Sequence, residues 1–242
     1  MSARQRRTPR DARRRSLGQN FLEVSLAERL IAEADFRPGE LVLEIGAGLG
    51  AFTAPLARRG VELVAIELDP VWAARLRARA PALGPRVRVV EADFERVALP
   101  QRPFRAFGSL PFARTTDVLR RLLDDPRVPL QRADLIVQWE VARKRAAVPP
   151  QTLRSAAWAP WWEFRQGSRI PAAAFRPVPR VDAAVLVVIR RAPPLLPPAM
   201  AYAFARFVRG AWPFDAPPPG APLCERARHS RRHGSEKEEG SA

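Results

Sequence analysis

Short apolar runs alternate with amphipathic segments along most of the chain. Residues 41–45 and 61–66 are apolar except for one glutamate each. Runs of this length are typical of strands that are buried on both faces of a parallel sheet. Residues 22–34 and 71–80 carry apolar side chains at the spacing of a helix that buries one face. This alternation of strands and helices predicts an α/β fold with a doubly wound sheet.

The same alternation continues into the second half of the chain. A loop rich in proline and arginine at residues 176–182 leads into a long apolar run, which we expect to be a strand. At 242 residues, the chain is long enough for one large core and a small appendage. The remaining elements that the pattern predicts are strands at residues 87–90, 135–139, 170–175 and 183–189, and helices at residues 113–123 and from residue 140.

Three glycines follow the first predicted strand at every second position. Gly46, Gly48 and Gly50 precede an apolar segment, residues 51–56, that suits a helix. A strand, a glycine turn and a helix form the ligand-binding opening of doubly wound folds, because a backbone without side chains lets a ligand approach closely. Glycine turns also occur for their geometry alone, so the motif by itself leaves both interpretations open.

Two glutamates decide which ligand suits this turn. Glu67 ends the second predicted strand, 21 residues after Gly46, where a carboxylate can accept hydrogen bonds from both hydroxyls of an adenosine ribose. The glycine spacing differs from the G-x-G-x-x-G pattern of dinucleotide enzymes. Glu44, directly before the turn, would repel a pyrophosphate. A cationic ligand without phosphate fits both acids, and the sequence therefore favours S-adenosylmethionine as the cofactor.

The chain is strongly basic. It has 41 lysine and arginine residues against 25 aspartate and glutamate residues, which gives a formal net charge of +16. A charge of this size indicates a polyanionic partner, and nucleic acid is the simplest one. Only Lys144 and Lys237 are lysines. Such a preference for arginine is also what a GC-rich genome produces, so codon usage is a second explanation for part of the basicity.

Cysteine and histidine are too rare for several classes of site. Cys224 is the only cysteine, which excludes a disulfide framework and a cysteine zinc site. The two histidines, His229 and His233, lie in a polar C-terminal segment, and we predict no metal site. No apolar run approaches the roughly 20 residues of a membrane span. We expect a cytoplasmic monomer that does not bind membranes.

A pentapeptide near the N-terminus resembles a family signature. Residues 18–22, Gly-Gln-Asn-Phe-Leu, are similar to the signature of the ribosomal RNA adenine N6-dimethyltransferases. That family comprises the small-subunit biogenesis enzymes and the Erm-type macrolide-resistance enzymes. In such enzymes the segment closes over the cofactor, and the resemblance assigns Asn20 and Leu22 as cofactor contacts. The other cofactor-binding residues that we expect are Glu44, Gly46, Gly48, Glu67, Asp93 and Ser109.

Asp93 follows the third predicted strand. Because the ends of successive parallel strands face one crevice, we expect this carboxylate beside the cofactor adenine, where it can accept from the exocyclic amine. The resemblance assigns it the same role. An aspartate that caps a helix is the alternative, and the two roles are compatible.

The chemistry is expected at Ser109-Leu110-Pro111-Phe112. This motif resembles the Asn/Asp/Ser-x-Pro-Tyr/Phe motif of methyltransferases that act on the exocyclic amines of adenine or cytosine. Such an amine is a poor nucleophile, because its lone pair is delocalised into the ring. The Ser109 hydroxyl and the Leu110 carbonyl can accept its two hydrogens, Pro111 fixes the turn, and Phe112 can stack on the base. Most relatives have asparagine in place of Ser109.

The resemblance covers about residues 16–210 and is strongest to the Erm branch at residues 138–145. It implies methyl transfer from S-adenosylmethionine to N6 of an adenine in 23S ribosomal RNA, with resistance to macrolides, lincosamides and streptogramins. Two alternatives stay open: a 16S ribosomal RNA adenine N6-dimethyltransferase of ribosome biogenesis, and a non-catalytic RNA-binding protein on the same fold. The net charge of +16 argues against a methyltransferase that acts on a small molecule.

The chain is expected to divide into four parts. The first part, residues 1–15, holds seven arginines and one aspartate and has no apolar periodicity, which is typical of arms that lie along phosphates. The last part, residues 213–242, lacks helical periodicity and differs abruptly in composition from the rest of the chain, which suggests a truncated or frame-shifted terminus. The parts are a flexible basic arm (1–15), a methyltransferase domain with a Rossmann-like class I sheet (16–191), a remnant of a helical RNA-binding domain (192–212) and a disordered tail (213–242).

Overall fold

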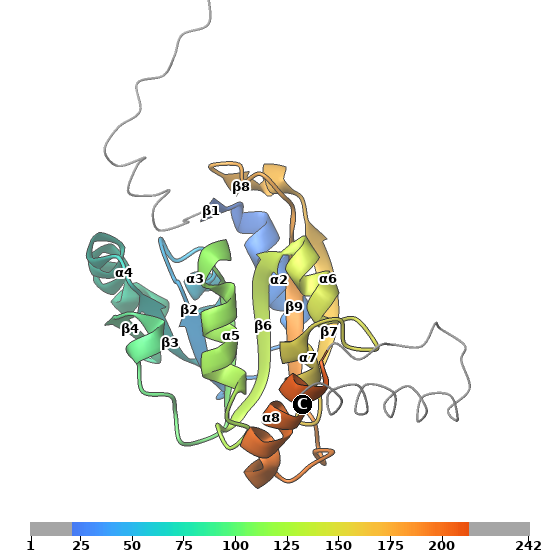
Figure 1. The fold of residues 1–242 in the computed structure, drawn as a ribbon. Coiled ribbons are helices and arrows are strands. Elements are labelled where there is room, and N and C mark those ends of the chain that lie inside the picture. Colours follow the sequence, from blue (N-terminus) through green and yellow to red (C-terminus); the bar gives the residue numbers. More distant parts are fainter. Residues whose placement is uncertain (1–20, 213–242) are drawn as a thin grey trace, which may run out of the picture.

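The computed structural model describes residues 21–212, which form a seven-stranded sheet flanked by helices (Figure 1). The strand order is β4-β3-β2-β5-β6-β9-β7, in which the first five strands are parallel and the last two are antiparallel to their neighbours. The predicted doubly wound α/β sheet is confirmed. The strands are β2 (Leu41–Ile45), β3 (Glu62–Glu67), β4 (Val87–Glu91), β5 (Phe104–Ser109), β6 (Leu130–Gln138), β7 (Trp162–Ile170) and β9 (Ala183–Arg190).

Helices cover both faces of the sheet. Leu43 of β2 lies in one core with α5, and its neighbour Val42 lies in a second core with α2 and α3. Adjacent residues of a strand point to opposite faces, so a strand that is apolar at almost every position needs cover on both. The helices are α2 (Val24–Ala34), α3 (Thr53–Arg58), α4 (Pro70–Leu83), α5 (Thr115–Leu123), α6 (Trp139–Arg145), α7 (Leu153–Trp158) and α8 (Ala201–Ala211).

The carboxyl ends of four parallel strands meet at one edge of the sheet. Ile45, the last residue of β2, lies opposite Ile66 of β3 and Gly108 of β5. Glu67 ends β3 opposite Glu91, which ends β4. This register brings the glycine turn, Glu67 and the segment after β5 to the same edge.

The structure corrects two of the predicted strands. Residues 170–175 are not a strand of the main sheet, because β7 ends at Ile170 and β8 (Phe175–Arg176) pairs with β1 (Phe21–Leu22) in a separate two-stranded sheet. β7 is an edge strand with several exposed polar side chains, so it lacks the apolar run of a buried strand. β6 begins well before residue 135, and Trp139 begins α6 instead of ending the strand.

Three tryptophans near the end of α7 belong to the core. Trp158, Trp161 and Trp162 are each at most 4% exposed, which agrees with packing and not with stacking on RNA bases. Trp161 also holds α8 against the domain, through an edge-to-face contact with Phe204 at 5.9 Å between ring centroids. No helix among residues 21–212 is long and apolar enough to cross a membrane.

Candidate active site

The turn after β2 is built from backbone conformations that favour glycine. Gly46, Gly48 and Gly50 have φ angles of 75°, 55° and 85°, in the left-handed region. The amides of Gly46 and Ala47 both donate to the carbonyl oxygen of Ile66, which fastens the turn to β3. A side chain at Gly46 would also approach the backbone carbonyl of Ser109, at 3.6 Å. The turn therefore lies against the first residue of the predicted catalytic motif.

Glu67 lies beside this turn and accepts hydrogen bonds from the backbone. Its Oε2 accepts from the amide of Gly48 at 2.6 Å, and its Oε1 accepts from the amide of Asp69 at 2.8 Å. Burial raises the pKa of Glu67, and these backbone hydrogen bonds oppose the rise. The side chain is thus oriented toward the glycine turn, on the side where a ribose was predicted.

Glu44 is the second acid of this edge, and it is fully buried. Its Oε2 accepts from the Thr53 hydroxyl at 2.7 Å, but no described residue donates to its Oε1. Burial raises the pKa of Glu44 to about 8, and the charge of Glu67 adds to the rise. A cation at this edge would relieve the repulsion between the two carboxylates. The residues present therefore fit a cationic ligand such as S-adenosylmethionine, and the charge of that ligand would favour the ionised form of Glu44.

Asp93 follows β4 at the same edge. Its Oδ1 accepts from the amide of Glu95 at 3.1 Å, so it caps the short 3₁₀ helix Phe94–Arg96, as the alternative interpretation proposed. Its Oδ2 lies 3.4 Å from the guanidinium of Arg114. The side chain is 28% exposed, so a further hydrogen bond to a ligand is sterically open.

Arg114 was not singled out from the sequence. It forms an ion pair with Glu95 as well as with Asp93, and thereby ties the segment after β5 to the segment after β4. An arginine two residues after Phe112 carries no signal by itself, because the chain has arginines throughout. Only the folded arrangement reveals that this residue connects the two loops.

The predicted catalytic motif forms the turn between β5 and α5. Ser109 ends β5 and is half-buried, and the amide of Leu110 donates to the carbonyl oxygen of Ile136 in β6 at 3.0 Å. Pro111 then starts the 3₁₀ helix Phe112–Arg114. Phe112 is half-buried and packs on the core beneath α2 and α3. Among residues 21–212, none donates a hydrogen bond to the Ser109 hydroxyl or to the Leu110 carbonyl, which leaves both as acceptors.

Two of the predicted cofactor contacts, Asn20 and Leu22, come from the N-terminal part of the chain. Asn20 is outside the described residues. Leu22 belongs to β1 and pairs with Phe175 of β8 through the backbone. The glycine turn, Glu44, Glu67, Asp93 and Ser109 are brought to one edge of the sheet, and their assignment as a cofactor site stays a prediction.

This arrangement defines a class of protein. A doubly wound sheet with a seventh strand inserted antiparallel, a glycine turn after its first central strand and acids at the next strand ends is the nucleoside-binding domain of class I methyltransferases. Residues 10–212 match the family model described as "Ribosomal RNA adenine dimethylase". The chain belongs to that family.

Individual relatives are consistent with this membership. An "rRNA methyltransferase" of Streptomyces thermotolerans is 43% identical over 205 residues, which are 84% of this chain and 67% of the relative. The "Mycinamicin-resistance protein MyrB" of Micromonospora griseorubida is 40% identical over 78% of this chain, and the match spans 60% of its own length. The crystal structure of the 23S rRNA methyltransferase ErmE superposes with a TM-score of 0.71 at 32% identity and covers 78% of both chains.

Proposed function

We propose that the protein transfers a methyl group from S-adenosylmethionine to N6 of an adenine in 23S ribosomal RNA, and so confers resistance to macrolides, lincosamides and streptogramins. The observation that carries the chemistry is the pair of acceptors at Ser109 and Leu110 to which no described residue donates, in a turn whose Ser109 backbone lies against the glycine turn. Family membership supports ribosomal RNA as the substrate. The choice of 23S RNA is supported by the similarity to the 23S rRNA methyltransferase ErmE, and the choice of antibiotic resistance by the similarity to the mycinamicin-resistance protein MyrB.

The chain offers a complete set of groups for the cofactor. Glu67 would accept from the ribose hydroxyls and Asp93 from the adenine amine, and the positive charge of the sulfonium would favour the ionised form of Glu44, whose pKa is raised by burial. When bound, S-adenosylmethionine supplies an electrophilic methyl group. The glycine turn leaves room for the adenosyl moiety, because its backbone carries no side chains.

The residues after β5 would hold the adenine that is methylated. Two acceptors on the hydrogens of the amine favour the geometry in which its lone pair becomes available. Pro111 and the ion pairs of Arg114 hold these acceptors in place, so they need little reorientation before transfer. The base must leave its stack to reach this edge, and the half-buried ring of Phe112 would stack on it.

The remaining proposals concern organisation. We interpret residues 21–191 as the described part of the methyltransferase domain, and α8 as the first helix of the RNA-binding appendage. The net charge of +16 supports binding to RNA along a surface wider than the catalytic edge. We propose that the protein acts as a monomer.

Methyl incorporation tests the proposed function. We expect the purified chain to methylate 23S fragments and not 16S fragments, with mono- and dimethyladenosine separated by mass. Ser109→Ala should lower turnover while cofactor affinity stays nearly unchanged. Phe112→Ala should cost more, because stacking on a flipped base contributes roughly 1–3 kcal/mol. Ser109→Asn, the residue of most relatives, is the matched control and should keep activity.

The alternatives predict different results. Methylation of 16S fragments alone would assign the protein to ribosome biogenesis. No incorporation into either RNA, together with intact RNA binding, would leave the non-catalytic interpretation. Full activity of both alanine variants would remove the catalytic assignment of this motif.

A further inference from the structure

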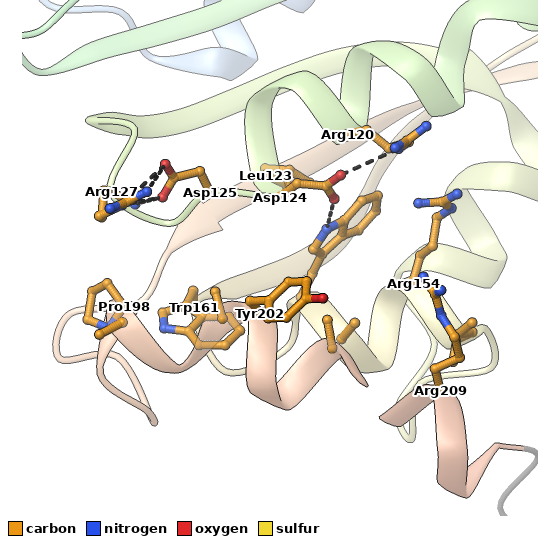
Figure 2. Close-up of a pocket in the computed structure, with 16 residues that line it drawn as sticks. Arg120, Leu123, Asp124, Asp125, Arg127, Arg154, Trp161, Pro198, Tyr202 and Arg209 are labelled. Carbon is orange, nitrogen blue, oxygen red and sulfur yellow. Dashed lines mark hydrogen bonds and ion pairs between the residues drawn. The ribbon is translucent and has the colours of Figure 1, made fainter. Parts of the chain in front are cut away.

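A cavity lies at the opposite end of the sheet from the candidate active site. A cavity of about 490 Å³ opens between the C-terminal end of α5, α7 and α8, close to where β6 begins (Figure 2). Cavities of 300–1,000 Å³ are typical of small-molecule sites. α5 connects the two ends, because it starts next to the Phe112–Arg114 turn and ends at the cavity.

Aromatic residues line the cavity, and the indole N–H groups of its two tryptophans donate hydrogen bonds within the protein. The indole N–H of Trp158 donates to Asp124 at 2.9 Å, and that of Trp161 donates to the carbonyl oxygen of Leu196 at 2.8 Å. Tyr202 of α8 also lines the cavity and is 74% exposed. An exposed ring at the mouth of a cavity suits a planar ligand.

Positive charge at this cavity is not balanced by acids. Asp124 accepts from Trp158 and lies 3.4 Å from Arg120, while Arg127 pairs with Asp125 and lowers the pKa of that carboxyl. Both acids are thus engaged. Arg154 and Arg209 line the same cavity, and neither forms an ion pair with any residue that the structure describes (Figure 2).

Arg145 adds to this charge from behind the cavity. It donates to the hydroxyls of Thr152 and Ser155 and stacks on Trp158, with 5.2 Å from its guanidinium carbon to the ring centroid. Burial lowers the pKa of Arg145, and the nearby charge of Arg154 lowers it further. The guanidinium groups of Arg145 and Arg154 lie near each other without an acid between them, and such a pair attracts an anion.

We propose that this cavity binds a nucleotide, whose phosphate lies on Arg154 and Arg209 and whose base stacks on Tyr202. Guanidinium groups bind phosphate oxygens through paired, charge-assisted hydrogen bonds, and aromatic rings stack on any base. The nucleotide is either part of an RNA strand or free. Only the RNA source rests on the proposed function, and binding at the cavity does not require methyl transfer.

The first experiment uses adenosine 5′-monophosphate as the probe. Its affinity for the full chain is measured by ligand-observed NMR with saturating S-adenosylhomocysteine, which keeps the probe out of the methyl-donor site. The double variant Arg154→Ala/Arg209→Ala should weaken binding at least about tenfold, as expected when charge-assisted hydrogen bonds are removed. The matched control is Arg59→Ala/Arg88→Ala, which removes two exposed arginines, one at the end of α3 and one in β4.

The second experiment separates the two sources. Filter binding of a ribosomal RNA fragment is measured over a range of salt concentrations for both double variants. If the cavity takes a nucleotide of RNA, the salt slope of the cavity variant should become shallower than that of the control by roughly 0.7, because one phosphate is no longer neutralised. Equal slopes with a selective loss of the monophosphate assign the site to a free nucleotide. If neither measurement distinguishes the cavity variant from the control, the proposal is wrong.

Discussion

Glu44 and Glu67 bring two carboxylates to one edge of the sheet in different environments. Glu67 is held by two backbone amides, which favour its charged form. Glu44 has one hydroxyl donor and no exposed surface, which favours its neutral form. The difference follows from position, because Glu44 lies within β2 and Glu67 lies at the end of β3. Each residue therefore gives its own prediction.

The first prediction concerns the pH dependence of stability. Glu44 has a pKa of about 8 in the folded chain against 4.5 for an unperturbed glutamate. Between these values the folded state holds a proton that the unfolded state has released, so the free energy of unfolding falls as pH rises. Relative to the wild type, Glu44→Gln should be least favoured near pH 4 and become progressively more stable toward pH 8. Urea unfolding without cofactor measures this.

Glu91→Gln is the control for that series, because Glu91 lies at the end of the neighbouring β4 and is exposed. It removes one carboxylate from the same edge of the sheet without changing a buried group. A pH dependence of Glu44→Gln equal to that of this control would mean that Glu44 is ionised in the folded protein.

The second prediction concerns cofactor affinity. Glu67→Gln replaces two acceptor oxygens by one, so either Gly48 or Asp69 loses its acceptor, and the ribose loses a charge-assisted bond. We expect S-adenosylmethionine to bind more weakly by about 1.5–3 kcal/mol in titration calorimetry. Thermal unfolding of the variant establishes that it is folded. Unchanged affinity in a folded variant would contradict the assignment of Glu67.

The position of a single site residue could be predicted from the sequence where the residue follows a predicted strand at a regular interval. The glycine turn, Glu67 and Asp93 follow strand ends at intervals that parallel sheets share, so their convergence could be expected. The roles of Thr53 and Arg114 could not, because each depends on a contact between segments that are separate in sequence.

At the scale of elements, β2, β3, β4 and β9 were predicted, β6 was predicted in part, and β5 and β7 were not. β2, β3 and β9 are apolar at nearly every position. β5 was not predicted, since Arg105 interrupts it; the fold buries this arginine against Asp134, Glu40 and two carbonyls of the chain at the end of α2. β7 was missed because its exposed edge is polar. Tertiary contacts thus override local pattern in these two strands.

The third prediction tests how closely β2 and β5 approach. A Cβ at Gly108 would lie 2.3 Å from the carbonyl oxygen of Ile45, and a backbone atom of a central strand cannot move aside. We expect Gly108→Ala to lower the free energy of unfolding by at least about 2 kcal/mol. Gly210 of α8 has no atom within 4 Å of such a Cβ, so Gly210→Ala should instead stabilise by about 0.5–1 kcal/mol. Urea titration compares the two, and equal effects would contradict this explanation.

At the scale of the whole molecule, charge is the dominant property. The net charge of +16 predicts RNA affinity that falls steeply with salt. The basic arm, residues 1–15, lies outside the described residues, and its contribution to RNA binding is separable from that of the folded domain.

The fourth prediction concerns this arm. Deleting residues 2–14 removes six arginines and one aspartate. If the arm lies along RNA phosphates, the salt slope of RNA binding should become shallower by up to roughly 4, at about 0.7 for each phosphate that the arm neutralises. Filter binding at several salt concentrations measures the slope. A slope that does not change would identify the arm as a solubilising tail.

The strand order has a consequence for how new specificities arise. The segments after β2, β3 and β4 carry most of the groups assigned to the methyl donor, whereas the segment after β5 carries the groups assigned to the acceptor base, and Ser109 is assigned to both. The chain crosses from one half of the sheet to the other only once, between β4 and β5. Evolution can therefore exchange the acceptor half as a unit while the donor half is inherited unchanged. A chimera joined in the loop at residues 98–103 should keep the donor affinity of its first parent and take its target nucleotide from its second.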